Sequence, residues 1–519
     1  MTLRMLRVTQ KVLAAAVLCA LPACAQIESN VPDASFDQPK STSQTTPTLR
    51  VYSRETIVDV LVTDDKGQPV RGLTQSDFTV SEDDHPQPIR SFYEYDKTTP
   101  PTPARTLPPN TYTNARTLPA NGPVQIFLFD LLGSPPADME RASKYIAQYL
   151  RTMPEGTQVA IFEFSPSKDL VLLHDFTTDG PAAAAVVDKL NVEWVRNPFL
   201  PVPIAIAGMN RIADYVSAIH GRKNLIWVVP GMPLKILRDG GLACSIGPPD
   251  MIIIHRLMDL YDRFTQEQIA IYPLNPRGIH ALGPCGPDDV ADATGGASDN
   301  TNDYKSEAAK FVDSTSHLYT LSYIPPRSVE DGHFHPIKIT IDRPGLHLLY
   351  RTGYNDEQPD PPAPALIHDM IQGPMRLGAI PSTQLLFDLN VQPASSSQPT
   401  PTAPAKAAPH TKGSPYNTVF QFDPKQIALT QNPDGTRTAA IEIDLGAYDS
   451  FGQLVAARSQ TFNLTITPAQ YAGFLHAPLK FPLAIDFPHG QLTLRAGLFD
   501  TIANQSGTLE IPLTIPKSK

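Results

Sequence analysis

The feature that most constrains the fold is a run of apolar strands alternating with helical segments between residues 123 and 325. Its first strand, 124–131, is apolar at nearly every position, which is typical of a parallel strand covered on both faces. The segment 136–153 then repeats apolar side chains at helical spacing. This alternation predicts a doubly wound α/β sheet with right-handed crossovers.

The rest of this region keeps the same alternation. We expect further strands at 158–164, 170–174, 224–229, 269–274 and 318–323, and further helices at 181–190, 204–219, 250–266 and 304–312. The strand 318–323 is expected to end the run, which gives an α/β domain over 122–325.

The sequence on either side of the α/β domain has the alternating pattern of β-strands. Residues 50–96 form short apolar and polar alternations between turns, but about 45 residues are marginal for a free-standing sandwich. We therefore predict that 50–96 pairs with 333–354, so that the α/β domain is an insertion within this β-sandwich. Residues 383–392 and 416–516 predict a second, C-terminal β-sandwich, and the chain is multidomain.

Proline-rich stretches separate these domains. The chain of 519 residues has 54 prolines, about twice ordinary usage. The predicted linkers are 97–121, rich in Pro and Thr; 355–382, with a short helix; and 393–415, rich in Pro, Ser and Ala. Residues 26–50 have few large apolar side chains and are expected to be disordered.

The N-terminus has the pattern of a secretory signal peptide over residues 1–25. Basic residues precede an apolar run of about ten residues, which is shorter than the ~20 that a membrane-spanning helix needs. No later stretch is long enough either, so we predict a secreted or periplasmic protein without a transmembrane segment. An alternative reads Leu21-Pro22-Ala23-Cys24 as a lipobox, with Cys24 lipidated.

Charge and cysteine content narrow the possible partners and the compartment. The formal net charge is −10, from 42 basic and 52 acidic side chains, and no basic block is present, which argues against nucleic acid as a partner. Cys244 and Cys285 are the cysteines that remain after the signal peptide, and an oxidising compartment favours their pairing. The alternative is two independent buried thiols.

Nine short motifs occur along the chain in an order that is typical of one protein family. They are 127–130 (FLFD), 159–162 (VAIF), 176–179 (FTTD), 221–226 (GRKNLI), 271–274 (IYPL), 293–296 (ATGG), 319–323 (YTLSY), 334–339 (FHPIKI) and 351–354 (RTGY). Together they resemble the von Willebrand factor A (VWA) domain, and the chain is similar to the secreted VWFA-related proteins abundant in acidobacteria. The match covers about residues 55 to 355.

The resemblance implies a metal site that this chain has largely lost. VWA domains usually hold Mg²⁺ or Mn²⁺ through a DxSxS motif, a threonine from a second loop and an aspartate after the fourth strand. Asp130 and Ser134 match the first motif, but Leu132 replaces its first serine. Residues 191–205 contain no serine or threonine, and Pro230-Gly231 stands where Asp-Gly is expected. We predict no tight divalent metal binding there and no cofactor.

The same resemblance gives the cysteines a place. Cys244 follows the fourth strand of the implied sheet and Cys285 the fifth, both in loops rich in Gly and Pro. In this fold the two strands are neighbours and both loops leave the sheet at its carboxyl rim. A disulfide that braces the rim is the resulting hypothesis.

Other motifs with catalytic or metal-binding chemistry are weak. The sequence has no GxSxG, HExxH, Walker loop or CxxC. His333 and His335 could ligate a metal from one face of a strand, but no third ligand is evident and we interpret them as solvent-facing. Residues 299–303 (DNTND) resemble a calcium loop without its glycine and closing glutamate, and we interpret them as an exposed turn.

The resemblance implies a binding or adhesion module rather than a known reaction. We predict an exported, non-catalytic protein that takes a protein or cell-surface ligand at the carboxyl rim, where open α/β sheets place their ligands. Two alternatives remain open: a periplasmic enzyme or enzyme subunit acting on envelope polysaccharide, and a structural spacer.

Overall fold

The computed structural model describes most of the chain beyond residue 54. The described ranges are 55–95, 105–116, 123–131, 135–165, 169–191, 202–229, 234–236, 242–245, 251–276, 288–298, 317–326, 333–356, 373–394 and 413–517. The predicted signal peptide 1–25, the segment 26–50 and the helix 304–312 lie outside them. Among the described residues, no helix combines the length and the apolar character that crossing a membrane requires.

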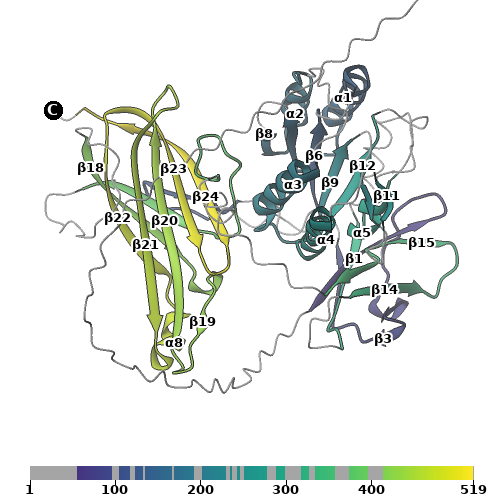
Figure 1. Ribbon diagram of the computed structural model, residues 1–519. Helices are drawn as coiled ribbons and strands as arrows, with labels where there is room; N and C mark the ends of the chain where they lie inside the picture. The colour runs from purple at the N-terminus through teal and green to yellow at the C-terminus, as the bar shows by residue number, and fades with distance from the viewer. Residues whose placement is uncertain are drawn as a thin grey trace, which may run out of the picture. The chain divides into compact units, whose positions relative to one another are not determined.

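A five-stranded sheet in the order β12-β9-β6-β7-β8 forms the centre of the α/β domain (Figure 1). Its strands are β6 (Val124–Asp130), β7 (Val159–Ser165), β8 (Asp169–Thr177), β9 (Lys223–Val228) and β12 (Ile269–Leu274). All pairs are parallel except β7 with β8. From β6 the chain builds the sheet outward in one direction through β7 and β8, and then returns to the other side of β6 to add β9 and β12. This is the order of a doubly wound sheet, and the direction of winding reverses between β6 and β9.

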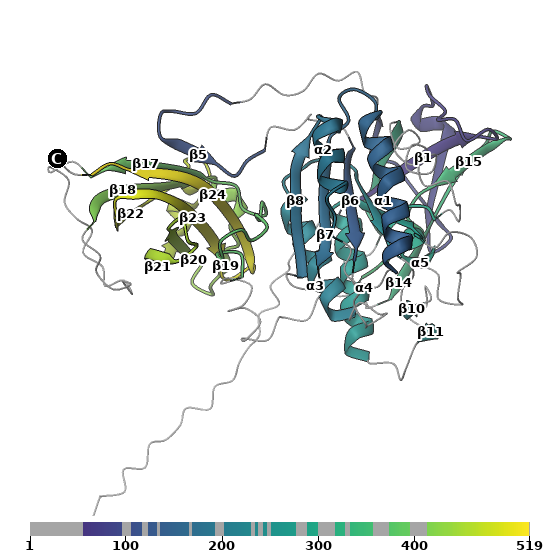
Figure 2. The same ribbon diagram turned by 90° about the horizontal axis from the view of Figure 1, so that it is seen from above.

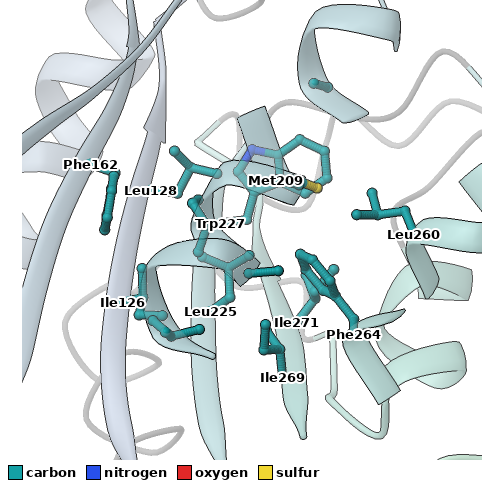
Figure 3. Close-up of a cluster of buried hydrophobic side chains, with 14 of the residues drawn as sticks. Ile126, Leu128, Phe162, Met209, Leu225, Trp227, Leu260, Phe264, Ile269 and Ile271 are labelled. Carbon is teal, nitrogen blue, oxygen red and sulfur yellow. The ribbon is translucent and has the colours of Figure 1, made fainter. Parts of the chain in front are cut away.

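Helices cover both faces of this sheet because its strands are apolar on both sides. On β6, Phe127 and Phe129 pack with α1 (Pro136–Arg151) and α2 (Gly180–Val187). The alternate side chains Ile126 and Leu128 pack in the opposite core with α3 (Val202–Val216) and α4 (Met251–Gln266). Figure 2 shows the two helix pairs on opposite faces, and Figure 3 shows Trp227 in the core on the side of α3 and α4. A short helix, α5 (Asp288–Thr294), follows β12.

Two four-stranded sheets, β15-β1-β13-β4 and β16-β14-β2-β3, form the first sandwich. Four strands precede the α/β domain: β1 (Thr56–Asp64), β2 (Phe78–Glu82), β3 (His85–Gln87) and β4 (Ser91–Tyr95), with the 3₁₀ turn η1 (Gln75–Asp77). Four follow it: β13 (Leu318–Tyr323), β14 (Phe334–Ile341), β15 (Leu346–Leu349) and β16 (Gly353–Asn355). β1 pairs with β13 and β15, and β2 pairs with β14, so both halves contribute to each sheet.

The sequence pattern led us to expect that strand 318–323 ends the α/β sheet, and this prediction is wrong: the strand, β13, belongs to a different sheet. It lies between β1 and β4 in the first sandwich. Tyr319, Leu321 and Tyr323 point into the sandwich core, whereas the intervening Thr320 and Ser322 hydrogen-bond to Asp59 and Glu55. This alternation of apolar and polar side chains belongs to a strand with two different faces and not to a parallel strand covered by helices.

The C-terminal sandwich also has two sheets, β22-β18-β17-β5 and β19-β20-β23-β24, with β21 paired to β20. Its elements are β5 (Thr111–Thr113), β17 (Asp388–Pro393), β18 (Ser414–Phe422), η3 (Pro424–Gln426), β19 (Thr430–Gln431), β20 (Arg437–Tyr448), β21 (Leu454–Ile466), α8 (Pro468–Phe474), β22 (Leu479–Phe487), β23 (Gly490–Asp500) and β24 (Gln505–Ile515). Apolar side chains from both sheets form one core between them. Several sheets therefore make this a multidomain, β-rich chain.

The strand β5 corrects the prediction that 97–121 is only a linker. It pairs with β17, with Thr111 opposite Asn390 and Thr113 opposite Asp388. The β-branched and aromatic residues of Thr-Tyr-Thr favour a strand even inside a segment rich in Pro and Thr. In the predicted linker 355–382, residues 373–378 form turns, and residues 357–372 lie outside the described ranges.

Asn114 fixes the end of β5 to the C-terminal sandwich. It is 6% exposed, its Nδ2 donates to the Leu385 carbonyl (2.8 Å), and its Oδ1 accepts from the Phe387 N–H (2.8 Å). These bonds satisfy backbone groups that would otherwise be buried without partners.

We expect Asn114→Ala to lower the free energy of unfolding of the C-terminal sandwich by about 1 to 3 kcal/mol, because it leaves buried backbone groups without hydrogen bonds. Differential scanning calorimetry of the full chain measures this. Gln491→Ala, which truncates an exposed amide on β23, is the matched control and should leave the transition unchanged. Equal transitions for both variants would mean that β5 is not an integral strand.

Candidate functional site

The reversal of strand order between β6 and β9 marks where a ligand is expected on the α/β domain. Open α/β sheets bind ligands outside the carboxyl ends of their strands at such a switch point. Here β6 ends at Asp130, β9 at Val228 and β12 at Leu274. We define the carboxyl rim as the segments that follow these three strand ends, together with the first two turns of α1 and of α4.

Asp130 is the predicted site residue that the structure describes on this rim. It is 1% exposed and lies in parallel register with Phe164 of β7. The N–H of the next residue, Leu131, donates to the Phe164 carbonyl at 3.3 Å, which continues the pairing beyond β6. Asp130 is therefore held inside the end of the sheet and is not exposed on its surface.

The other predicted site residues lie outside the described ranges. These are Ser134, the loop 192–201, Pro230-Gly231, Cys285, and Cys24 of the lipidation alternative. The residual metal ligands and the disulfide therefore stay predictions. The backbone of Cys244 lies in a described strand.

That strand belongs to a hairpin on the rim that the sequence pattern had not indicated. β10 (Leu234–Ile236) pairs with β11 (Leu242–Ser245) between β9 and α4, and Lys235 lies opposite Cys244. A signal was present in the sequence, because Asp239-Gly240 separates the two short strands and Asp-Gly is a strong hairpin turn signal.

The described rim offers cationic and apolar side chains. Arg141 on α1 pairs with Asp138 (2.7 Å) and donates to the Pro276 carbonyl after β12 (3.1 Å), which ties the two loops together. In the first turn of α4, Ile252 is 63% exposed, and His255 and Arg256 are exposed beside it in the sequence. Arginine and apolar side chains of this kind are groups that protein interfaces use.

Buried charges connect the opposite, amino end of the sheet to the first sandwich. Gln268 donates to both oxygens of Asp59 (3.2 and 3.1 Å), and the Asn355 N–H donates to Asp262 (3.0 Å). Burial raises the pKa of Asp262 to about 6 and lowers the pKa of Lys223 to about 8. Asp262 joins the two domains through Asn355, and Lys223 donates to the Glu267 carbonyl (2.6 Å) within the α/β domain, so we interpret both groups as structural.

His335 is not solvent-facing, and this corrects the interpretation from the sequence. It is 2% exposed, whereas His333 is exposed. It also has neighbours that can ligate a metal, because Glu82, Asp83 and His335 each offer one ligand atom within 4.8 Å of the others. Sequence reasoning missed this cluster because only the pairing of β2 with β14 brings the residues together. Residues 299–303 lie outside the described ranges.

Comparisons with known proteins find structural similarity over only part of this chain. No protein-family model and no curated protein matches the chain. Among solved structures, it is similar to an aerotolerance-related membrane protein from Bacteroides fragilis (12% identity, 37% of this chain and 98% of that chain, TM-score 0.26). It is also similar to the conserved hypothetical protein BatB from Bacteroides thetaiotaomicron (12%, 38% and 99%, 0.27) and to the SpRpn10 VWA domain (15%, 35% and 85%, 0.22). Identities and TM-scores this low carry no argument about function.

Proposed function

We propose that this chain is an exported, non-catalytic binding protein that takes a protein or cell-surface ligand at the carboxyl rim of its α/β domain. The observation that carries the proposal is the reversal of strand order between β6 and β9, which is where open α/β sheets bind their ligands. Export rests on the signal-peptide pattern of residues 1–25.

The chemistry of the rim supports recognition of a macromolecule. Ile252 presents an apolar side chain in the first turn of α4, and Arg141, in the second turn of α1, holds its partly exposed guanidinium between Asp138 and the Pro276 carbonyl. Affinity would come from side-chain and backbone complementarity, with apolar contacts at the centre and charged contacts around them.

The residues of the rim do not fit the divalent ion that the VWA resemblance implies. Mg²⁺ demands near-ideal octahedral coordination by oxygen. Asp130 is buried at the end of β6, and the sequence replaces two of the other ligands with Leu132 and Pro230. One carboxylate and the hydroxyl of Ser134 are too few protein ligands for a dedicated site, so ligand binding at the rim is proposed to be independent of metal.

We expect titration calorimetry with Mg²⁺ and Mn²⁺ to show no micromolar binding that depends on Asp130, because the donor set is incomplete. The full chain and its Asp130→Ala variant should give the same isotherms. Micromolar binding that Asp130→Ala abolishes would show that the metal site has been kept.

We expect Ile252→Asp to reduce ligand capture at least about tenfold, because it places a charge within an apolar contact. Quantitative pull-down from the native envelope compares the wild-type chain with this variant. Ile502→Asp makes the same substitution at a 39% exposed isoleucine in the C-terminal sandwich and is the control. The same proteins captured equally by wild type and Ile252→Asp would contradict a ligand site on the rim.

A further inference from the structure

A tight turn places Asp83 beside the buried end of β14. Asp83 and Asp84 form the two-residue connection between β2 and β3, with φ of 49° and 62°. Positive φ at both positions is the requirement of a type I′ hairpin turn, and aspartate tolerates it better than most residues. The Asp83 N–H donates to the Pro336 carbonyl at 3.1 Å, so the turn is fixed against β14.

His335 lies on β14 with its imidazole held on two sides. Its Nδ1 is 2.9 Å from Asp83 Oδ2. Its ring centroid is 5.4 Å from that of Tyr354, the residue opposite it on β16. The side chain of His335 is 3% exposed and that of Asp83 is 23% exposed, so the pair meets solvent on the side of Asp83.

Glu82 brings a second carboxylate to this position. It is 1% exposed, and its Oε2 accepts hydrogen bonds from the hydroxyls of Tyr323 (2.6 Å) and Tyr354 (3.2 Å). Both hydroxyls donate to one oxygen, and a carboxylate has lone pairs enough to accept them and still bind an ion.

We propose that Glu82, Asp83 and His335 bind one divalent transition-metal ion of the Zn²⁺ class. One ligand atom from each residue lies within 4.8 Å of the other two. The 2.9 Å between His335 Nδ1 and Asp83 Oδ2 is a hydrogen-bond distance, and tetrahedral Zn²⁺ bonds of about 2.1 Å place neighbouring ligands roughly 3.4 Å apart, so the two atoms need separate by only about half an ångström to share one ion. A divalent ion would also balance two carboxylates placed close together in a buried site.

The donor set selects the class of metal. Zn²⁺ accepts imidazole nitrogen together with carboxylate oxygen, whereas Ca²⁺ and Mg²⁺ prefer oxygen ligands alone. Water completes the coordination from the exposed side of Asp83.

The proposed ion has a structural role. Asp83 and His335 are 252 positions apart, on opposite sides of the α/β domain in the sequence. An ion shared by them joins the β2–β3 turn to β14 and so locks together the two halves of the first sandwich. Binding to the folded state alone stabilises that state by mass action.

The test is titration calorimetry of the full chain, first treated with a chelator, using ZnCl₂ as the probe. We expect one Zn²⁺ per chain, with affinity reduced about tenfold or more in Asp83→Asn and in His335→Gln. The matched controls are Asp84→Asn in the same turn and His333→Gln on the same segment, and both should retain the wild-type affinity. The thermal unfolding midpoint should rise with ZnCl₂ in the wild type and not in the first two variants.

Three results would overturn the proposal. The first is a wild-type chain that binds no Zn²⁺, and the second is wild-type affinity in both Asp83→Asn and His335→Gln. The third is sulfur in the first coordination shell by zinc X-ray absorption, which would assign the ion to Cys244 or Cys285. If circular dichroism shows that either variant is misfolded, Glu82→Gln replaces it, because its amide oxygen still accepts from the tyrosine hydroxyls while the charge is lost; wild-type affinity in Glu82→Gln would also refute the site.

Discussion

The antiparallel pairing of β1 with β13 is the constraint on which the arrangement of the chain depends. Thr56 lies opposite Tyr323 and Val60 opposite Tyr319, although the α/β domain separates the two strands in the sequence. The entropic cost of closing such a long connection grows only slowly with its length, so a whole domain can be inserted. Both ends of the α/β domain are then held by one sandwich, and the buried contacts of Asp59 and Asp262 reinforce the connection.

The C-terminal sandwich repeats this solution with β5. That strand precedes the α/β domain in the sequence but pairs with β17, which follows it. Each sandwich is therefore completed by strands from both sides of the α/β domain. The proposed metal ion would also link segments from before and after the α/β domain, since Asp83 precedes that domain in the sequence and His335 follows it.

The sequence indicates those parts of the fold that local pattern determines. The nearly continuous apolar run 124–130 predicts a strand buried on both faces, and the structure confirms this, since every side chain of β6 is buried. The placement of β13 depends instead on its register with β1 and β4, and β5 is a three-residue strand inside a stretch rich in proline. The burial of His335 likewise follows from partners far away in the sequence. The spacing of His333 and His335 alone therefore could not predict that Glu82 and Asp83 lie beside His335.

The carboxyl rim depends both on local sequence pattern and on the order of the strands in the sheet. The end of β6 and the first turn of α4 are local features, but only the strand order brings them to the same edge of the sheet. The most direct test of rim binding is hydrogen–deuterium exchange of the full chain, alone and with its captured ligand. The account predicts protection in peptides covering 135–141 and 251–256. Protection confined to either sandwich, with unchanged exchange in those two peptides, would contradict it.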